Sequence, residues 1–294
     1  VLGQTNFSLY SAATTQSGMN SPTSLSFDGV ANRLYVADTY NHRVLVYDVA
    51  SITNGENAVN VLGQTDFTTG SYSTTQNRMY YPRGVKFDGG TRLFVADASN
   101  NRVLVFDTAS ISDGENAVNV LGQTTFTTLT SGLAQNKLFS PMGIASDLSG
   151  NRLFVADNSN NRVVVYDVAS ITDGENAVNV VGQTNYTAST SGSTQNTLNT
   201  PRGVSFDPGM NRLYIADQNN HRVIVQSMGP VPPSTSTLTA VGGSATGKID
   251  LSWPSAGDDG AFNDLTGYYR IQYATYTATW STSAWASPSI LSTT

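Results

Sequence analysis

The chain has 294 residues, no cysteine, a formal net charge of −6, and charged side chains at only 12% of its positions. The lack of cysteine excludes a disulfide framework, a thiolate metal site and a cysteine nucleophile. Most of the 15 lysines and arginines stand at two repeated positions. No basic cluster is therefore left to bind nucleic acid or an anionic membrane surface. No apolar run reaches the ~20 residues of a spanning helix, so we expect no membrane insertion.

A pentapeptide at the start of the chain returns three times. Val-Leu-Gly-Gln-Thr begins at Val1, Val61 and Val120, and it returns as Val-Val-Gly-Gln-Thr at Val180. A second block, Arg-Leu-Tyr-Val-Ala-Asp at 33–38, has counterparts at 92–97, 152–157 and 212–217. The spacing of about 60 residues predicts four copies of one supersecondary unit.

Each copy resolves into four expected strands. In the first copy these are 24–28, 33–38, 43–48 and 59–67, with a short turn at 39–42 between the second and third. The runs are rich in Val, Leu, Tyr and Phe and are bounded by Gly, Asn, Asp and Pro, as is typical of strands.

The two middle strands of each copy are apolar on both faces. In the strand 33–38, Leu34 and Val36 point to one side while Tyr35 and Ala37 point to the other. A sheet with water on one face alternates apolar and polar residues, so these sheets must be covered on both sides. Stacking each sheet against its neighbour and closing the series radially makes a β-propeller, which we predict to have four blades of about 60 residues. A solenoid of stacked sheets is the competing geometry.

The fourth copy ends its third strand at Val225 and then enters Ser-Met-Gly-Pro, without a fourth strand. Conversely, residues 1–7 are a fourth-type strand with no blade of their own. We therefore expect Val1–Phe7 to pair with the last blade and close the ring. If the chain is a fragment, six or more blades are the alternative.

Beyond the predicted propeller at 1–228, the segment 229–237 reads as a stiff proline-rich linker. Three strand-like runs follow, at Leu238–Val241, Lys248–Trp253 and Gly267–Ala274. Leu251-Ser-Trp253 and Tyr268–Tyr273 resemble the front half of a fibronectin type III domain, in which Trp253 and Ile271 are core residues. At 238–294 this domain is shorter than the ~100 residues of such a sandwich, so we expect it to be incomplete.

The repeat itself resembles a known family. Asp38-Thr-Tyr-Asn-His-Arg-Val44 and its counterpart Asp217–Val223, each preceded by a strand such as Leu-Tyr-Val-Ala-Asp, resemble the NHL repeat. Pro82-Arg-Gly-Val85 and the Val-Leu-Gly-Gln strand are similar to bacterial NHL proteins. The resemblance covers residues 1 to about 226 and implies a β-propeller, more often with six blades than four.

Features present in every copy are interpreted as structural. Asp38 and Arg43 lie across one turn and recur four times, so we expect a pair that braces the blade. His42 and His221 occupy the same turn position, where the other copies have asparagine, and two ligands do not make a closed zinc site.

Calcium is the one cofactor that the sequence leaves open. Asn54-Gly-Glu-Asn57 and its counterparts at 113–116 and 173–176 supply few oxygens each, so we interpret them as turns. Asp258 and Asp259 are a further calcium hypothesis. We expect no other metal and no other cofactor.

A ligand site is expected where the repeat loses its symmetry. The position after the first-strand proline carries Thr23, Arg83, Met142 and Arg202, which we expect near one mouth of the channel. The two arginines could hold an anionic group, although solvated rim residues are the plain alternative. Tyr40, the only aromatic residue in the four turns, is a candidate sugar-stacking residue.

These observations favour a secreted or cell-surface binding or scaffold module that contacts protein or carbohydrate, with no catalysis and no catalytic residues. A propeller hydrolase or lyase, of the lactonase or glycan-degrading kind, is one alternative. The other is a subunit of a surface filament or layer that self-associates by strand exchange through residues 1–7 or the incomplete sandwich.

Overall fold

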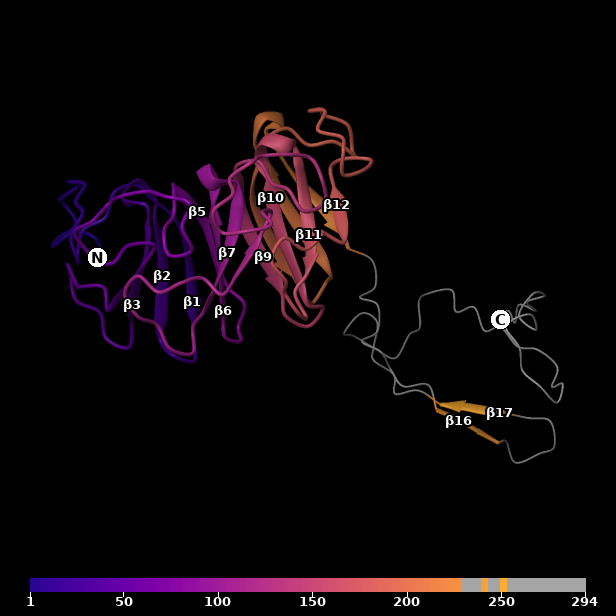
Figure 1. Ribbon diagram of the computed structural model, residues 1–294, viewed down its shortest axis with the longest axis horizontal. Helices are drawn as coiled ribbons and strands as arrows, with labels where there is room; N and C mark the ends of the chain where they lie inside the picture. The colour runs from indigo at the N-terminus through magenta and orange to yellow at the C-terminus, as the bar shows by residue number, and fades with distance from the viewer. Residues whose placement is uncertain (229–238, 243–248, 253–294) are drawn as a thin grey trace. The chain divides into compact units, whose positions relative to one another are not determined.

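The structure is a computed structural model that describes residues 1–228, 239–242 and 249–252. The chain divides into two compact units, Val1–Gly229 and Pro230–Thr294. The first unit is built from four successive antiparallel sheets, the blades of a β-propeller (Figure 1). The predicted all-β class and the four blades are confirmed.

The blades follow the repeat of the sequence. Blade 1 contains β1 (Pro22–Asp28), β2 (Arg33–Asp38), β3 (Arg43–Asp48) and β4 (Asn60–Leu62). Blade 2 contains β5 (Pro82–Phe87), β6 (Arg92–Asp97), β7 (Arg102–Asp107) and β8 (Asn119–Leu121). Blade 3 contains β9 (Pro141–Asp147), β10 (Arg152–Asp157), β11 (Arg162–Asp167) and β12 (Asn179–Val181). Blade 4 has three strands, β13 (Pro201–Asp207), β14 (Arg212–Asp217) and β15 (Arg222–Ser227).

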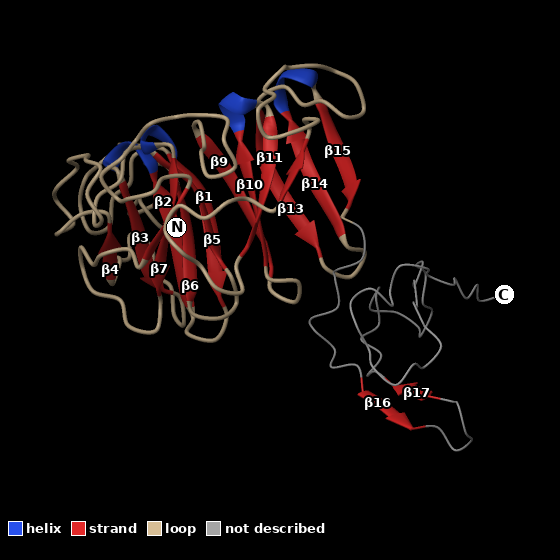
Figure 2. Ribbon diagram, turned by 45° about the vertical axis from the view of Figure 1, so that its right-hand side comes forward, coloured by secondary structure: helices blue, strands red, loops and turns tan. Residues whose placement is uncertain are grey.

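A single turn of 3₁₀-helix joins the second and third strand of every blade. These turns are η1 (Thr39–Asn41), η2 (Ala98–Asn100), η3 (Asn158–Asn160) and η4 (Gln218–Asn220). The next residue, His42 in blade 1 and Asn101 in blade 2, has the left-handed backbone conformation, which asparagine tolerates better than most residues. Figure 2 shows the short helices, in blue, at the same end of the blades. We call this the turn end of the propeller.

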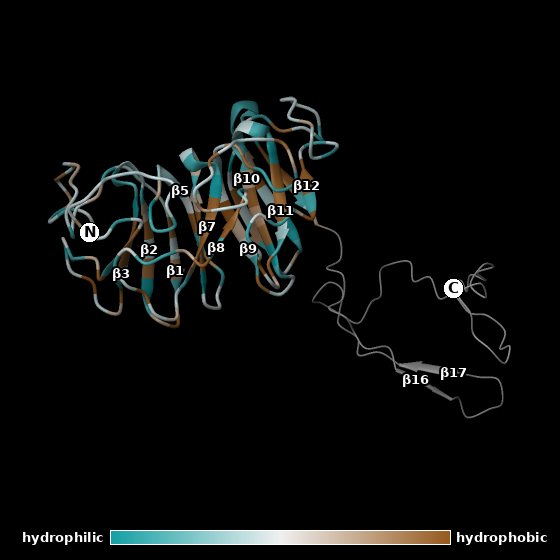
Figure 3. Cartoon of the chain, viewed as in Figure 1, coloured by the Kyte–Doolittle hydropathy of each residue, from teal (hydrophilic) through white to brown (hydrophobic). Residues whose placement is uncertain are grey.

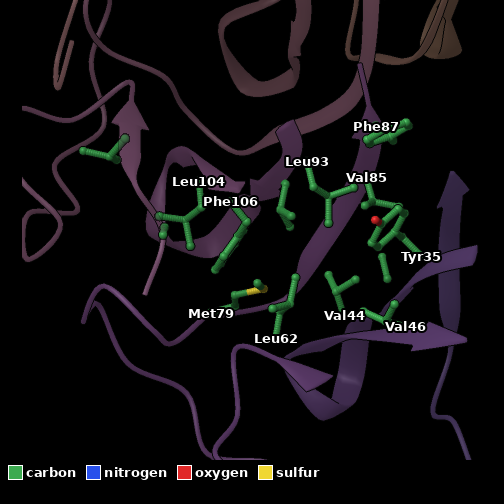
Figure 4. Packing of buried hydrophobic residues seen from close by; sticks show 14 residues of the cluster. Tyr35, Val44, Val46, Leu62, Met79, Val85, Phe87, Leu93, Leu104 and Phe106 are labelled. Carbon is green, nitrogen blue, oxygen red and sulfur yellow. The ribbon is translucent and has the colours of Figure 1, made fainter. Parts of the chain in front are cut away.

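Blades 2 and 3 bury both of their faces because each lies between two others, and blades 1 and 4 pack against one neighbour each. We call the side toward the following blade the forward face and the opposite side the rear face. Tyr35, Ala37, Val44 and Val46 form the forward face of blade 1 and are almost completely buried. They pack in one cluster with the rear face of blade 2, which includes Val85, Phe87, Leu93, Val95, Leu104 and Phe106 (Figure 4).

The same packing joins blade 2 to blade 3 and blade 3 to blade 4. The first strands of successive blades also lie side by side, β1 against β5, β5 against β9, and β9 against β13. The hydropathy colouring shows apolar strands within polar loops (Figure 3). The two-sided apolar pattern therefore has the physical cause that the sequence suggested, burial between blades.

The N-terminal segment differs from the expectation. Val1–Phe7 does not pair with blade 4; Gly3 forms an isolated parallel bridge with Gly18, and Gly55 donates its backbone N–H to the Val1 carbonyl at 2.9 Å. The reason lies in the repeat, because each outer strand contacts two blades. Val61 pairs with Leu45 of its own blade and also accepts a hydrogen bond from Gly114 of the next blade. Val1 makes only the second of these contacts.

The second unit contributes an antiparallel hairpin, β16 (Thr239–Gly242) paired with β17 (Ile249–Ser252). Its strands coincide with two of the three predicted runs, Leu238–Val241 and Lys248–Trp253. The predicted linker 229–237, the run Gly267–Ala274 and the proposed core residues Trp253 and Ile271 lie outside the described residues. The fibronectin type III resemblance stays a prediction.

Candidate functional site

An Asp–Arg ion pair spans every turn and is fully buried in blades 1 to 3. In blade 2, Arg102 Nε lies 2.7 Å from Asp97 Oδ2, and both side chains are fully buried. Asp97 also accepts hydrogen bonds from Asn100 Nδ2 and from the backbone N–H of Tyr80, at 2.8 and 2.6 Å. A buried charge is tolerated when it is paired and fully hydrogen-bonded, as here. The pair recurs in all four blades, which agrees with the structural role predicted for it.

In blades 1 to 3 the left-handed residue after the 3₁₀ turn connects its blade to the next one. Asn101 Oδ1 accepts the backbone N–H of Ser140 at 2.9 Å, and Asn161 Oδ1 accepts that of Thr200 at 2.8 Å. In blade 1 the acceptor is His42 Nδ1, which lies 3.2 Å from the backbone nitrogen of Tyr81. His42 therefore has a structural role, as predicted.

His42 is held in its neutral form by its surroundings. Burial lowers the pKa of its imidazole, and the nearby carboxylate of Asp38 opposes this effect. The hydrogen bond acts in the same direction as burial, because Nδ1 can accept from Tyr81 only while it carries no proton.

The four residues predicted for the channel mouth lie along the first strands at the turn end. Thr23 Oγ1 donates to the Arg83 carbonyl at 2.9 Å, which places β1 beside β5. Met142 lies on β9, between the strands that carry Arg83 and Arg202. We call these four residues the inner rim. Within the described chain neither rim arginine forms an ion pair, and the two are separated by a strand rather than adjacent.

The sequence suggested that Tyr40 is an isolated aromatic residue. In the structure it belongs to an aromatic cluster. Its ring lies 5.3 Å from that of Tyr81, edge to face, and Tyr81 stacks on Tyr80 at 4.8 Å. Tyr80 in turn stacks on Tyr72 at 4.1 Å. The His42 ring meets Tyr72, Tyr80 and Tyr81 edge to face. We call these five residues the aromatic cluster.

Local structure explains why the cluster forms at this position. Thr39 Oγ1 donates to the Pro82 carbonyl at 2.7 Å and so holds η1 against the start of β5. Tyr81 has φ of 52°, a left-handed conformation that is uncommon for a bulky residue, and the bond to His42 helps to hold it there. The cluster is open to solvent, because Tyr40 is 49% and Tyr72 60% exposed.

Sequence reasoning missed Tyr72, Tyr80 and Tyr81, although a signal was present. The segment Met79-Tyr-Tyr-Pro82 has the counterparts Met19-Asn-Ser-Pro22, Leu138-Phe-Ser-Pro141 and Leu198-Asn-Thr-Pro201. The tyrosine pair is thus a second departure from symmetry. That it meets Tyr40 depends on which turns lie against which strands, and this only the fold decides.

The turns that contain Gly-Glu-Asn are hydrogen-bonded to the preceding blade. Asp113 Oδ1 accepts the backbone N–H of Val61 at 3.0 Å, and Asp173 Oδ1 accepts that of Val120 at the same distance. Across residues 1–228 and the hairpin, no three His, Asp or Glu side chains gather where they could hold a metal ion. Asp258 and Asp259, the other calcium hypothesis, lie outside the described residues, and calcium stays a prediction.

A family model described as the NHL repeat matches residues 19–47, 140–166 and 198–225, which carry the first three strands of blades 1, 3 and 4. Three of the four blades match the NHL repeat. The resemblance drawn from Asp38–Val44 and Asp217–Val223 is thereby supported, and blade 2 has the same strand order and turn.

Among curated proteins, human NHL repeat-containing protein 2 is 32% identical over 143 residues, which cover 46% of this chain and 19% of the human protein. The chicken protein of that name is 35% identical over 94 residues, covering 30% and 12%, and the bovine one is 31% identical over 144 residues, covering 45% and 18%. The aligned part is therefore less than a fifth of each relative. None of the helices in the described segments is long and apolar enough to span a bilayer.

Proposed function

We propose that the NHL-type propeller is a non-enzymatic scaffold that binds another protein at its turn end, with the aromatic cluster as the centre of the contact. The observation that supports this most strongly is the exposure of Tyr40 and Tyr72 within the aromatic cluster. Function in a repeat protein is expected where one copy differs from the others.

The composition of this surface suits a protein contact. Tyrosine and arginine are enriched among the hot-spot residues of protein interfaces, the few whose truncation costs about 2 kcal/mol or more. Arg83, two residues after Tyr81 in the chain, is half-buried and adds a cationic group to this end of β5. The tyrosines are already packed together, so little side-chain freedom is lost on binding. A partner segment with apolar and acidic side chains fits this surface best.

The experiment compares the full chain with a Tyr40→Ser/Tyr72→Ser variant. Phage displaying random peptides are selected on the wild-type chain, and the enriched peptides are measured against both proteins. We expect at least about a tenfold loss of affinity in the variant, because stacked aromatic anchors are removed. Tyr10→Ser is the matched control, since Tyr10 is 94% exposed and lies outside the cluster. Peptides that bind the double variant as well as the wild type would disprove the assignment.

Carbohydrate contact is the second candidate, because an exposed tyrosine ring also stacks on sugars. A glycan array probed with the same three proteins separates the two ligand classes. Binding to glycans but not to peptides, lost in the double variant, would replace protein by carbohydrate as the ligand. Turnover in a screen of lactones and glycosides would contradict the non-enzymatic part of the proposal.

We also propose that the module acts outside the cell or on its surface. A chain of 294 residues without cysteine is insensitive to stray thiol oxidation, which suits an oxidising environment. Proteolysis of intact producing cells tests the location. Loss of the chain while cytosolic markers survive is the expected result, and full protection would contradict it.

A further inference from the structure

The two terminal blades each expose residues of a face that is buried in the other blades. On the forward face of blade 4, Val223 and Val225 are 62% and 54% exposed. Their counterparts in the three preceding blades are at most 1% exposed: Val44, Val103 and Val163 for the first position, and Val46, Val105 and Val165 for the second. The forward face of blade 4 is therefore an apolar blade surface without its neighbour.

The rear face of blade 1 shows the complementary defect. Leu25 and Phe27 are 66% and 55% exposed, whereas Val85 and Phe87 at the same positions of blade 2 are 3% and 7% exposed. Phe87 is buried against the Tyr35 ring of the preceding blade, with ring centroids 6.0 Å apart. Among the described residues Phe27 has no such ring partner, and Tyr214 of blade 4 stands at the position of Tyr35.

The N-terminal segment already lies where an outer strand would lie against the next blade. The Val1 carbonyl accepts the backbone N–H of Gly55 at 2.9 Å, just as the Val61 carbonyl accepts that of Gly114 at 3.0 Å. The Val1 amine also donates to Asn54 Oδ1. Leu2 packs on the rear cluster of blade 1. This segment pairs with no third strand of a blade. Within the part of the chain that the structure describes, β15 of blade 4 is the third strand without an outer strand beside it.

The polar groups at the two ends are complementary as well. Gln64 Nε2 donates to two carbonyls, those of Ser71 and of His42. Gln4 makes only the first type of bond, to Ser11 at 2.8 Å. In blade 4 the counterpart of the His42 carbonyl is the carbonyl of His221, which lies at the exposed end of the propeller.

We propose that a second copy of this chain docks head to tail, the rear face of its blade 1 on the forward face of blade 4 of the first copy. Its N-terminal segment then becomes the outer strand of that blade, with Leu2 opposite Val223 and Val1 opposite Ile224, as Leu62 lies opposite Val44 and Val61 opposite Leu45. This inference is independent of the proposed protein-binding site.

A second copy is the occupant that the structure favours, because this chain carries both halves of the contact. The interface repeats one that the molecule already makes three times, between successive blades. Such a heterologous contact closes into a ring if its rotation allows and otherwise extends into a filament.

Cross-linking tests the contact directly, because the chain has no native cysteine. Leu2→Cys and Val223→Cys variants of the 294-residue chain are mixed and mildly oxidised. A covalent heterodimer is expected, since directly opposed residues on paired strands are close enough for a disulfide. The control mixture replaces Val223→Cys by Val178→Cys. Val178 is 60% exposed, and its counterparts Val59 and Val118 are exposed too, so this position lies outside blade contacts.

A variant with both Leu2→Cys and Val223→Cys identifies the occupant. Covalent links between chains support the proposal, whereas a link within one chain shows that the propeller closes on itself and overturns it. No link in either experiment also overturns it.

Sedimentation over a range of concentrations gives the second measurement. Val223→Asp puts an unpaired charge into the contact and should weaken association by on the order of 100-fold. Val178→Asp should change it less than about twofold, because a surface charge is worth little. A wild-type chain that is monomeric at every concentration contradicts the proposal, and equal melting temperatures show that both variants are folded.

Discussion

Comparing one position of the inter-blade core between copies shows what its side chain contributes. Tyr166 is fully buried between blades 2 and 3, and its hydroxyl has no hydrogen-bond partner in the described residues. Burial correspondingly raises the pKa of this phenol. Phe106 occupies the same position in blade 2. The ring is needed for packing, and the hydroxyl contributes only a desolvation cost.

We therefore expect Tyr166→Phe to stabilise the propeller by about 1 kcal/mol, the cost of a buried unsatisfied hydroxyl. Chemical denaturation measures the change in the free energy of unfolding. Tyr186→Phe is the control, because its hydroxyl donates to the Ala177 carbonyl at 3.0 Å, and its loss should cost about 1 kcal/mol. Destabilisation by Tyr166→Phe would show that the hydroxyl has a partner.

The His42 imidazole predicts a dependence of stability on pH. The pKa of this imidazole is lowered in the folded chain from the ordinary value of about 6.5. When the pH falls below 6.5, the unfolded chain therefore binds a proton at His42 more readily than the folded chain does. The stability from neutral His42 is complete above that pH and is lost as pH falls through the folded pKa, by at most ~1.4 kcal/mol per pH unit.

His42→Asn isolates this effect. Asparagine keeps both the acceptor and the left-handed backbone, as Asn101 and Asn161 do. The difference in unfolding free energy between wild type and variant, measured at pH 7.5 and 5.0, should shift in favour of the variant at the lower pH. A difference that is the same at both pH values would contradict the assignment.

Among the elements, the first strands of the blades depend on their glycines. Pro-x-Gly begins β5, β9 and β13, and at two of these glycines the next strand passes very close. A Cβ on Gly84 would lie 2.2 Å from the Met142 carbonyl oxygen, whereas one on Gly203 would meet only Ala216 Cβ at 3.6 Å. The motif therefore reflects contact between strands rather than backbone freedom alone.

Gly84→Ala should accordingly destabilise the propeller by about 1–3 kcal/mol, because a backbone oxygen cannot move aside without shifting its strand. Gly203→Ala, in the same motif of blade 4, should change stability by less than about 0.5 kcal/mol in dilute solution. Thermal melts of both variants provide the comparison. Equal effects would show that strand spacing is not what requires the glycine.

The whole molecule is held together by contacts between copies. The turn at Asp113 fixes the outer strand of the preceding blade, and Asn101 fixes the first strand of the following one. Every blade thus needs neighbours on both sides, and the first and last blade each have one. The exposed Val223 and Leu25 are the consequence of this rule at the ends of the array.

Much of this organisation could be predicted from residues alone. The period, the strands, the buried Asp–Arg pair and the four blades follow from local patterns that recur four times, because the repetition removes chance matches. The position of Tyr40 and the residues of the inner rim were likewise visible as departures from the repeat. Such inferences need only the strand period and the chemistry of turns.

The tertiary structure decided what lies beside what. It joins Tyr40 to Tyr81 and Tyr72 across two blades, and it places Val1 on the blade that follows it rather than on blade 4. Sequence patterns report which face of a strand is buried but not which surface buries it. For a chain made of near-identical units, that choice depends on the order of the blades in space, and so do the binding surface and the uncovered ends.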